Sequence, residues 1–251
     1  MLSVTIITKN EETNLRRCLG SVKWANEIIV VDSGSTDNTL AIAREYTQNV
    51  YSHTDWQGYG VQKQRALDYA TCEWVLNLDA DECVSTELHQ ELCAALACNK
   101  YDAYRIPIRL NFYDRKLKFT SSPTRHARLF RRAHAQYSTD LVHEKIILPK
   151  NFRIGRLYQP ILHNSLRDIH HAIYKMNRYS SYSAKIKHNK QQSSSISAAL
   201  LSSSWMFLRC YLLQGGVFDG RAGFVLSVLN AHASFYRKVK QIYPDSIEEK
   251  L

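Results

Sequence analysis

The first hundred residues alternate between continuous apolar runs and segments with helical spacing, and this alternation is the feature that most constrains the fold. The apolar runs lie at Val4–Thr8, Ile28–Val31 and Trp74–Leu78, and Val50–His53 is a candidate third strand between the last two. Between them, apolar side chains recur three and four residues apart, as in the segment that opens at Glu11. Apolar strands separated by helices predict a mainly parallel sheet with helices on its faces. We therefore expect an α/β fold.

Polar side chains stand at the junctions between these strands and the helices that follow. Asp32 and Asp37 follow the second strand, Asp79 and Asp81 follow the fourth, and Lys63 lies in the segment between the third and the fourth. The carboxyl ends of parallel strands meet at one edge of the sheet, where open α/β sheets bind ligands. A single aspartate after a strand is more often a helix cap, but two junctions that carry Asp, with a third that carries Lys63, favour a ligand site.

The run from Trp74 to Glu82 ends in three carboxylates within four residues: Asp79, Asp81 and Glu82. Such a cluster repels itself, so a cation among the carboxylates would stabilise it, and hard oxygen ligands suit Mg²⁺ or Mn²⁺. The alternative is a solvated acidic turn followed by a helix with Ser85 as its N-cap. The residues of this stretch leave both interpretations open.

Charge is unevenly distributed along the chain. Residues 1–100 contain 8 Lys and Arg against 14 Asp and Glu, whereas residues 101–251 contain 25 against 9, so that the whole chain carries +10. A basic half indicates an anionic partner, which could be nucleic acid, a membrane surface or a phosphorylated substrate.

The six cysteines form no Cys-x-x-Cys pair and no regular framework, which predicts free thiols in a reducing compartment. The first residues, Met1–Ile7, read as a strand rather than a signal peptide. No apolar stretch is expected to reach the roughly 18 to 20 residues that span a bilayer. These features predict a cytosolic protein or one that lies on the cytosolic side of a membrane.

From Tyr101 onward the pattern becomes strand-like and basic. Tyr104–Phe112 and Ala127–Phe130 are expected strands, joined through the basic loop Tyr113–Lys118. Residues 101–132 contain nine Lys or Arg against two acids, so they form either a solvated surface or a site for phosphates or an anionic acceptor. Glu144 precedes Ile146–Leu148, which we expect to be buried, and is either a surface residue or a general base.

Residues 166–251 are predicted to be helical and basic, with a serine-rich linker at Gln191–Ser197. Trp205–Leu213 is an apolar segment that looks too short to span a membrane, and Ala222–Ala231 is a second apolar helix. Aromatic and aliphatic faces beside Lys and Arg suit a pair of interfacial helices. Packing of both helices on the preceding domain is the alternative.

Several motifs now resemble those of one known family. The segments Thr5–Glu12, Ile29–Asp37 and Leu78–Glu82, in this order, resemble family 2 glycosyltransferases with the GT-A fold. Arg128–Arg132, Val142–Glu144 and Gly216–Phe224 are similar to the branch that includes lipopolysaccharide core biosynthesis glucosyltransferases. The resemblance covers nearly the whole chain.

This resemblance implies a Rossmann-like, mainly parallel sheet flanked by helices and followed by a basic helical extension. The catalytic domain would comprise residues 1–165, with a nucleotide-binding half at 1–100 and an acceptor-side half at 101–165. Residues 166–251 would form the extension, which is a candidate for membrane association.

The resemblance also implies roles for individual residues. Thr8, Asn10 and Glu12 would line the base and ribose pocket, Asp32 would bond the uracil ring, and Lys63 would lie near the nucleotide. Asp79 and Asp81 would form the Asp-x-Asp pair, in which Asp81 binds the metal and Asp79 lies close to both ribose and metal.

Two further roles concern residues later in the chain. Glu144 falls at the position of the catalytic base. Many members have Glu-Asp where this chain has His-Glu, so Asp140 is the alternative candidate for the base. His163 falls where some GT-A enzymes place a late metal ligand, and a lone histidine is more often structural.

The implied activity is inverting, metal-dependent transfer of one hexose, with glucose expected, from a UDP-sugar. Mg²⁺ or Mn²⁺ would be the cofactor, and the acceptor would be a lipopolysaccharide inner core or related glycolipid at the inner-membrane surface. The Gln-x-x-Arg-Trp motif of processive members is absent from the sequence. A polysaccharide, lipid carrier or protein acceptor remains an alternative.

Two other classes of function fit less well. A nucleotidyltransferase would carry a Gly-rich triphosphate loop near the first helix, and the sequence has none. A nucleic-acid-binding protein would use the basic half, but the acidic first hundred residues would repel phosphates. We therefore expect no nucleic-acid partner.

Overall fold

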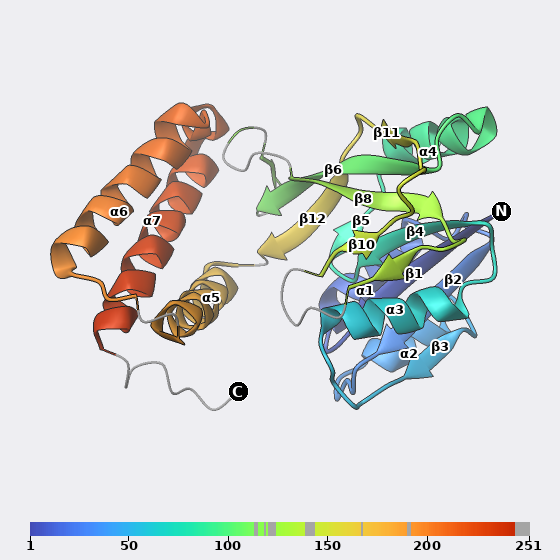
Figure 1. The fold of residues 1–251 in the computed structure, drawn as a ribbon, viewed down its shortest axis with the longest axis horizontal. Coiled ribbons are helices and arrows are strands. Elements are labelled where there is room, and N and C mark those ends of the chain that lie inside the picture. The colour runs from blue at the N-terminus through green and yellow to red at the C-terminus, as the bar shows by residue number, and fades with distance from the viewer. Residues whose placement is uncertain are drawn as a thin grey trace. The chain divides into compact units, whose positions relative to one another are not determined.

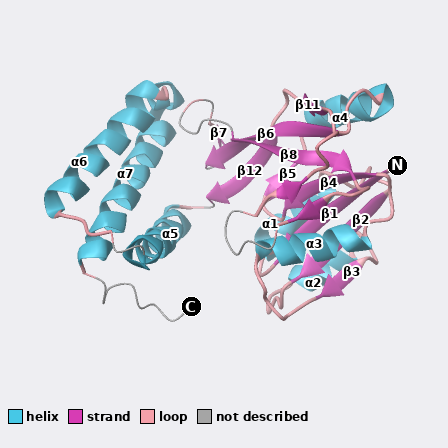
Figure 2. Ribbon diagram, in the orientation of Figure 1, coloured by secondary structure: helices cyan, strands magenta, loops and turns pink. Residues whose placement is uncertain are grey.

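The polypeptide folds into two units, shown as ribbons in Figures 1 and 2 of the computed structural model. The structure describes residues 1–112, 115–117, 119, 124–138, 144–166, 168–189 and 192–243. The N-terminal unit comprises Met1–Ile108 and Pro123–Asn164, and the C-terminal unit comprises Arg109–Ser122 and Ser165–Leu251. The segment Arg109–Ser122 thus groups with the helical extension, whereas the sequence-based division left it in the catalytic domain.

Four parallel strands lie side by side in the N-terminal unit, in the order β3-β2-β1-β4. Their bounds are β1 Leu2–Thr8, β2 Glu27–Asp32, β3 Val50–Ser52 and β4 Trp74–Asp79. Every residue of β1 is buried, because helices or neighbouring segments cover both of its faces. This burial explains why the strands read as continuous apolar runs rather than alternating ones.

The sheet continues beyond β4 with mainly antiparallel pairs, in the order β8-β6-β12-β5. These strands are β8 Thr124–Arg131, β6 Ala103–Phe112, β12 Ile161–Leu166 and β5 Glu82–Cys83. Two short strands, β7 Arg115–Lys116 and β11 Ile154–Arg156, pair with β6, and β9 Gln136–Tyr137 pairs with β10 Ile146–Ile147 in a separate ribbon.

Four helices connect and cover the strands of the N-terminal unit: α1 Glu12–Gly20, α2 Thr39–Arg44, α3 Tyr59–Tyr69 and α4 Thr86–Cys98. One core cluster includes Leu15 of α1 together with Val4 and Leu76 of the strands, and a second includes Ala66 of α3 together with Ile7. The strand–helix alternation confirms the predicted α/β class. Ser85, the predicted N-cap of α4, accepts a hydrogen bond at its Oγ from the Leu88 amide (3.2 Å).

The C-terminal unit is built from α5 Ile169–Asn189, α6 Ile196–Leu208, the π-helical turn η1 Arg209–Leu213, the 3₁₀ turn η2 Gly216–Asp219 and α7 Gly220–Ile242. Helix α7 packs against both α5 and α6. Ser202 and Ser234 form a hydrogen bond between α6 and α7 (2.6 Å), and buried Lys240 donates to Asn177 Oδ1 of α5 (2.6 Å).

Two expectations about apolar segments are wrong. Trp205–Leu213 is not an isolated short segment, because α6 and η1 form one helical stretch over Ile196–Leu213, 18 residues long and apolar enough by composition to cross a membrane. Only this stretch meets that test among the residues that the structure describes. Ile146–Leu148 was expected to be buried, and this is wrong for Ile147, which is 54% exposed, whereas Ile146 and Leu148 are partly buried against the second core cluster.

Candidate active site

Three of the predicted site residues lie at the carboxyl ends of neighbouring parallel strands. Thr8 of β1 is opposite Asp32 of β2, and Ile7 of β1 is opposite Asp79 of β4. Adjacent strands are about 4.8 Å apart, so this register gathers Thr8, Asp32 and Asp79 at one edge. Thr8 Oγ1 is buried and has no hydrogen-bond partner within the described part of the chain, which leaves a donor and acceptor for a ligand.

Asn10 and Glu12 join the loops that follow β1 and β2. Asn10, at φ 55°, accepts a hydrogen bond at Oδ1 from the Thr36 amide (2.8 Å). Glu12 accepts at Oε2 from the Asn38 amide (3.0 Å). Both side chains therefore stand at the same edge as Thr8, and their contacts fix the shape of the two loops.

The side chain of Asp32 forms the turn after β2. It is fully buried, and its Oδ2 accepts hydrogen bonds from the amides of Gly34 and Ser35 (both 2.9 Å). Gly34 has φ +88°, a conformation that favours glycine. The structure thus gives Asp32 a loop-forming role, and its predicted bond to uracil stays a prediction.

Lys63 lies between Asp79, at the carboxyl edge of the sheet, and Glu144, the predicted base. From α3, its Nζ lies 3.0 Å from Asp79 Oδ1 and 2.8 Å from Glu144 Oε1, and its side chain is only 7% exposed. Gly60, one turn earlier in α3, lets the backbone at Ser138 lie close to this helix. A Cβ at this position would be 1.9 Å from the carbonyl oxygen of Ser138. The reserve base, Asp140, falls outside the described residues.

Arg128 of β8 forms the other side of the same charged cluster. Its guanidinium donates to Asn77 Oδ1 (2.8 Å), to Asp79 Oδ2 (2.9 Å) and to Glu82 Oε1 (2.9 Å). Glu82 is 1% exposed and accepts at its second oxygen from the Asp79 amide (2.9 Å). Asp79 therefore forms one salt bridge with Lys63 through Oδ1 and a second with Arg128 through Oδ2, and its side chain is one-third exposed.

The members of this cluster shift one another's pKa values. Burial by itself would raise the pKa of Asp79, but Arg128 and Lys63 hold it well below its usual range. Burial would lower the pKa of Lys63, yet the charges of Asp79 and Glu144 raise it overall. Burial raises the pKa of Glu82 to about 7, against the opposing charge of Arg128. Asp79 is thus a stable carboxylate at neutral pH.

Asp81 and His163 form a separate pair beside the cluster. His163 Nε2 lies 3.0 Å from Asp81 Oδ2, because β12 pairs with β5 and sets His163 opposite Glu82. Burial would lower the pKa of His163, but Asp81 raises it overall. Among the described residues, no group of three or more His, Cys, Asp or Glu side chains is arranged to hold a metal.

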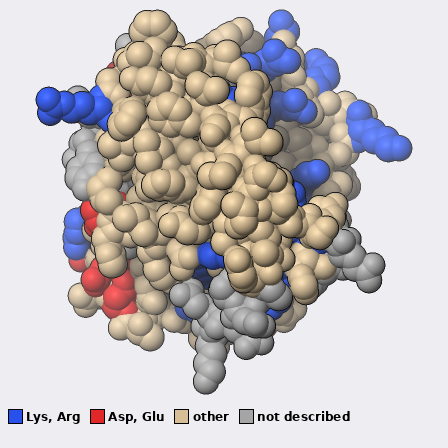
Figure 3. Space-filling view, turned by 90° about the vertical axis from the view of Figure 1, so that its left-hand side faces the viewer, with Lys and Arg blue, Asp and Glu red and all other residues tan. Residues whose placement is uncertain are grey.

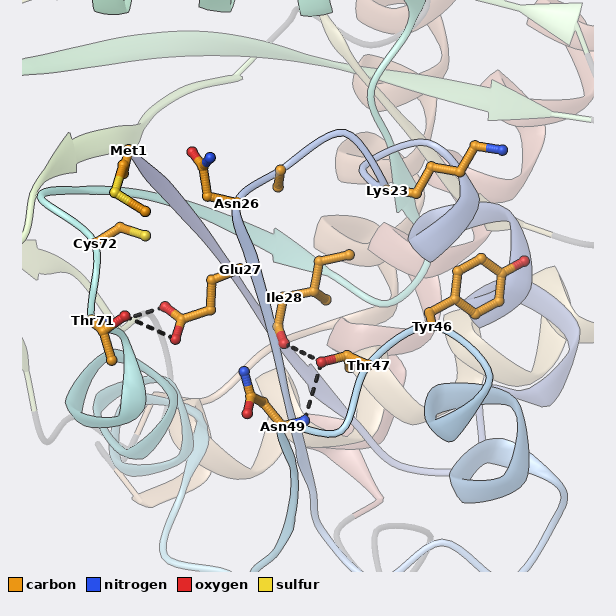
Figure 4. Close-up of a pocket in the computed structure, with 11 residues that line it drawn as sticks. Met1, Lys23, Asn26, Glu27, Ile28, Tyr46, Thr47, Asn49, Thr71 and Cys72 are labelled. Carbon is orange, nitrogen blue, oxygen red and sulfur yellow. Dashed lines mark hydrogen bonds between the residues drawn. The ribbon is translucent and has the colours of Figure 1, made fainter.

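A cavity of about 340 Å³ lies elsewhere in the N-terminal unit (Figure 4). It opens at the amino ends of β1 and β2, beside Met1 and Glu27, whereas the candidate site is at their carboxyl ends. Polar groups around it pair with one another, as when Thr71 donates from its amide to Glu27 (2.9 Å). This cavity is therefore separate from the candidate active site.

Sequence reasoning missed the positions of Arg128 and Glu82 in the centre of the cluster. Arg128 was noted from the sequence only as part of a segment similar to one branch of the family. Glu82 was noted only as one of three acids within four residues. A buried arginine needs carboxylate partners, but the partners are 46 and 49 residues away in the chain. Only the β4–β8 pairing brings them together.

Comparison with known proteins identifies the family. Residues 3–155 match the family model described as Glycosyl transferase family 2. An uncharacterized glycosyltransferase of Rickettsia typhi is 33% identical over 253 residues, which cover 95% of this chain and 86% of the relative. The chain therefore belongs to glycosyltransferase family 2.

A second relative supports the predicted branch. The lipopolysaccharide core biosynthesis glycosyltransferase LpsC of Rhizobium meliloti is 30% identical over 95% of this chain and 91% of LpsC. Among solved structures, S. aureus TarS 1–349 in complex with UDP superposes with a TM-score of 0.50 at 16% identity, over 97% of this chain and 91% of TarS 1–349. These likenesses confirm the predicted GT-A fold and the resemblance to the lipopolysaccharide-core branch.

Proposed function

We propose that the protein transfers one hexose from a UDP-sugar to a glycolipid acceptor of the lipopolysaccharide core class, with inversion at the anomeric carbon. The observation that carries this proposal is the position of Lys63, which bonds both Asp79 at the donor edge and Glu144, the candidate base. The name of the relative LpsC supports the acceptor class, and the UDP complex of TarS supports the donor.

Asp81 and His163 are the residues that would hold a divalent cation. Asp81 Oδ2 and His163 Nε2 lie 3.0 Å apart and would provide one carboxylate and one imidazole ligand. Two protein donors fit Mg²⁺ or Mn²⁺, which take their other ligands from substrate phosphates and water. The bound ion would supply Lewis-acid stabilisation of the departing diphosphate.

The remaining chemistry belongs to the chain's own side chains. Thr8 Oγ1 would bond the nucleotide, and Asp79, fixed by Arg128 and Lys63, would face the ribose. Glu144 would take the proton of the acceptor hydroxyl as the hydroxyl oxygen bonds the anomeric carbon and the bond from that carbon to the diphosphate breaks. Because the proton acceptor and leaving group are on opposite faces of the sugar, the configuration inverts.

Calorimetric titration with UDP tests the donor site. We expect binding in the presence of Mn²⁺ and much weaker binding in EDTA, because the diphosphate and the cation bind together. Asp81→Ala should weaken the Mn²⁺-dependent binding by roughly tenfold or more. Glu87→Gln, at an exposed acid of α4, is the matched control and should bind as the wild type does. Absence of UDP binding in both conditions would contradict the donor assignment.

Transfer to lipopolysaccharides truncated at successive core positions tests the acceptor class. Each reaction pairs one UDP-hexose with one truncated acceptor, and mass spectrometry reports the product. We expect one added hexose, with UDP-glucose as the best donor, and no longer chains. Transfer to a polysaccharide, lipid carrier or protein, but to none of the truncated cores, would refute the acceptor assignment and leave the donor assignment in place.

We place the reaction at the cytoplasmic face of the inner membrane, where a UDP-sugar and a growing glycolipid would meet. The support is the basic composition of the C-terminal unit, which suits an anionic lipid surface.

A further inference from the structure

Most of the exposed residues of α6 and η1 are large and apolar, and Ser197, Ser204 and Arg209 are the exposed exceptions. Of the 18 residues in Ile196–Leu213, only Ala199 and Cys210 are buried, and Arg209 is the only charged one. The α6 apolar face, as we define it, consists of the exposed side chains Ile196, Leu200, Leu201, Trp205, Leu208, Leu212 and Leu213. Surface helices of soluble proteins normally carry polar residues on the side away from their packing partner. An exposed apolar row of this length indicates an interaction surface.

The opposite side of α6 is already covered by α7. Ser202 bonds Ser234 of α7 (2.6 Å), and Ser203 Oγ donates to the Ala231 carbonyl of α7 (3.0 Å). Helix α7 in turn packs on α5, which carries the exposed cations Arg178 and Lys185. The helix therefore offers one face rather than its full circumference, which favours a helix lying in a membrane interface over one that spans the bilayer.

The charges of this unit indicate what covers the α6 apolar face. The C-terminal unit, Arg109–Ser122 and Ser165–Leu251, contains sixteen Lys and Arg against six Asp and Glu. Figure 3 looks at the α6 side of the C-terminal unit and shows a broad area with few charged side chains, with Lys and Arg mainly toward its edges and a group of Asp and Glu at the lower left. A second copy of the same unit would bring like charges together, whereas an anionic bilayer attracts them.

From this combination we propose that the α6 apolar face docks in the plane of an anionic lipid bilayer, with its leucines and Trp205 entering the boundary between headgroups and acyl chains. Trp205 suits this depth because its ring is apolar and its N–H is polar. The neighbouring cation Arg209 would contact lipid phosphates. This inference concerns the C-terminal unit alone and needs no sugar donor.

Vesicle flotation tests the docking surface. The full chain is floated with vesicles of phosphatidylcholine, with and without phosphatidylglycerol. We expect binding to the anionic vesicles and much weaker binding to the neutral ones. The double variant Leu201→Ser, Leu208→Ser should lower binding to anionic vesicles roughly tenfold or more, because two large side chains no longer leave water. Tyr158→Ser, at a 78% exposed aromatic of the N-terminal unit, is the control and should bind as the wild type does.

The remaining outcomes would overturn the proposal. These are failure of the wild type to bind either kind of vesicle, equal binding of the double variant, or resistance of the bound protein to alkaline carbonate, which would indicate a spanning helix. Self-association of the wild type that the double variant loses in sedimentation, without vesicle binding, would identify a second copy as the occupant. Far-ultraviolet circular dichroism of the same samples shows that the variants are folded, and a separate UDP titration keeps this result distinct from the donor assignment.

Discussion

Glu144→Gln is expected to reduce sugar transfer by about 10²- to 10⁴-fold while UDP binding stays at the wild-type level. The amide cannot take a proton from the acceptor hydroxyl, so the base is lost. Its Oε1 can still accept the hydrogen bond that Lys63 Nζ now donates over 2.8 Å, so the position of Lys63 and its bond to Asp79 should be retained. Initial rates of hexose transfer and calorimetric titration with UDP, measured on the same preparation, check both halves of the expectation.

Asp68→Asn is the matched control for this experiment. Asp68 is an exposed acid of α3, the helix that carries Lys63, and its carboxylate accepts a hydrogen bond from Gln64. Its substitution should change neither rate nor binding. If Glu144→Gln kept its turnover, another residue would have to deprotonate the acceptor, and Asp140 would be tested next.

Arg128→Met should destabilise the protein by roughly 3–5 kcal/mol, the effect expected when one partner of a buried ion pair is removed. Asp79 and Glu82 would lose their shared cation, and Glu82 is almost completely buried. Urea unfolding followed by circular dichroism measures the change. The exposed Arg156→Met serves as the control and should change the stability by less than about 0.5 kcal/mol.

A double variant separates loss of charge balance from loss of packing. Glu82→Gln combined with Arg128→Met removes both the buried cation and one buried anion, so it should recover part of the lost stability. If the double variant were as unstable as the sum of the single variants, the guanidinium would act through packing rather than through its charge.

The parallel half of the fold could be predicted because each element carries its own signal. β1 and β4 are mainly apolar and almost completely buried, and Ser85 caps α4 as its position before a helical pattern indicates. Strands β5, β11 and β12 were not predicted, because no run of apolar residues marks them and they are held by partners far away in the chain.

The candidate site was predictable where residues follow strands and unpredictable where it depends on pairing across the sheet. Thr8, Asp32 and Asp79 gather at one edge because parallel strands end there. That Arg128 would meet Asp79 and Glu82 depends on the antiparallel register of β8 against β4, which no local pattern encodes. The exposure of α6 could not be predicted either, because the sequence pattern of an apolar helix is the same whether another helix or a lipid surface covers it.

The contacts of Lys63 couple the effects of substitutions at Asp79 and Glu144. A single ammonium satisfies Asp79 and Glu144 together, so removing either carboxylate changes what the other one contacts. The effects of substitutions at these two positions are therefore not additive, and neither residue has a contribution that can be stated without the other. A substitution at Glu144 that cannot accept the hydrogen bond from Lys63 should therefore also change the surroundings of Asp79, whereas Glu144→Gln should leave them intact.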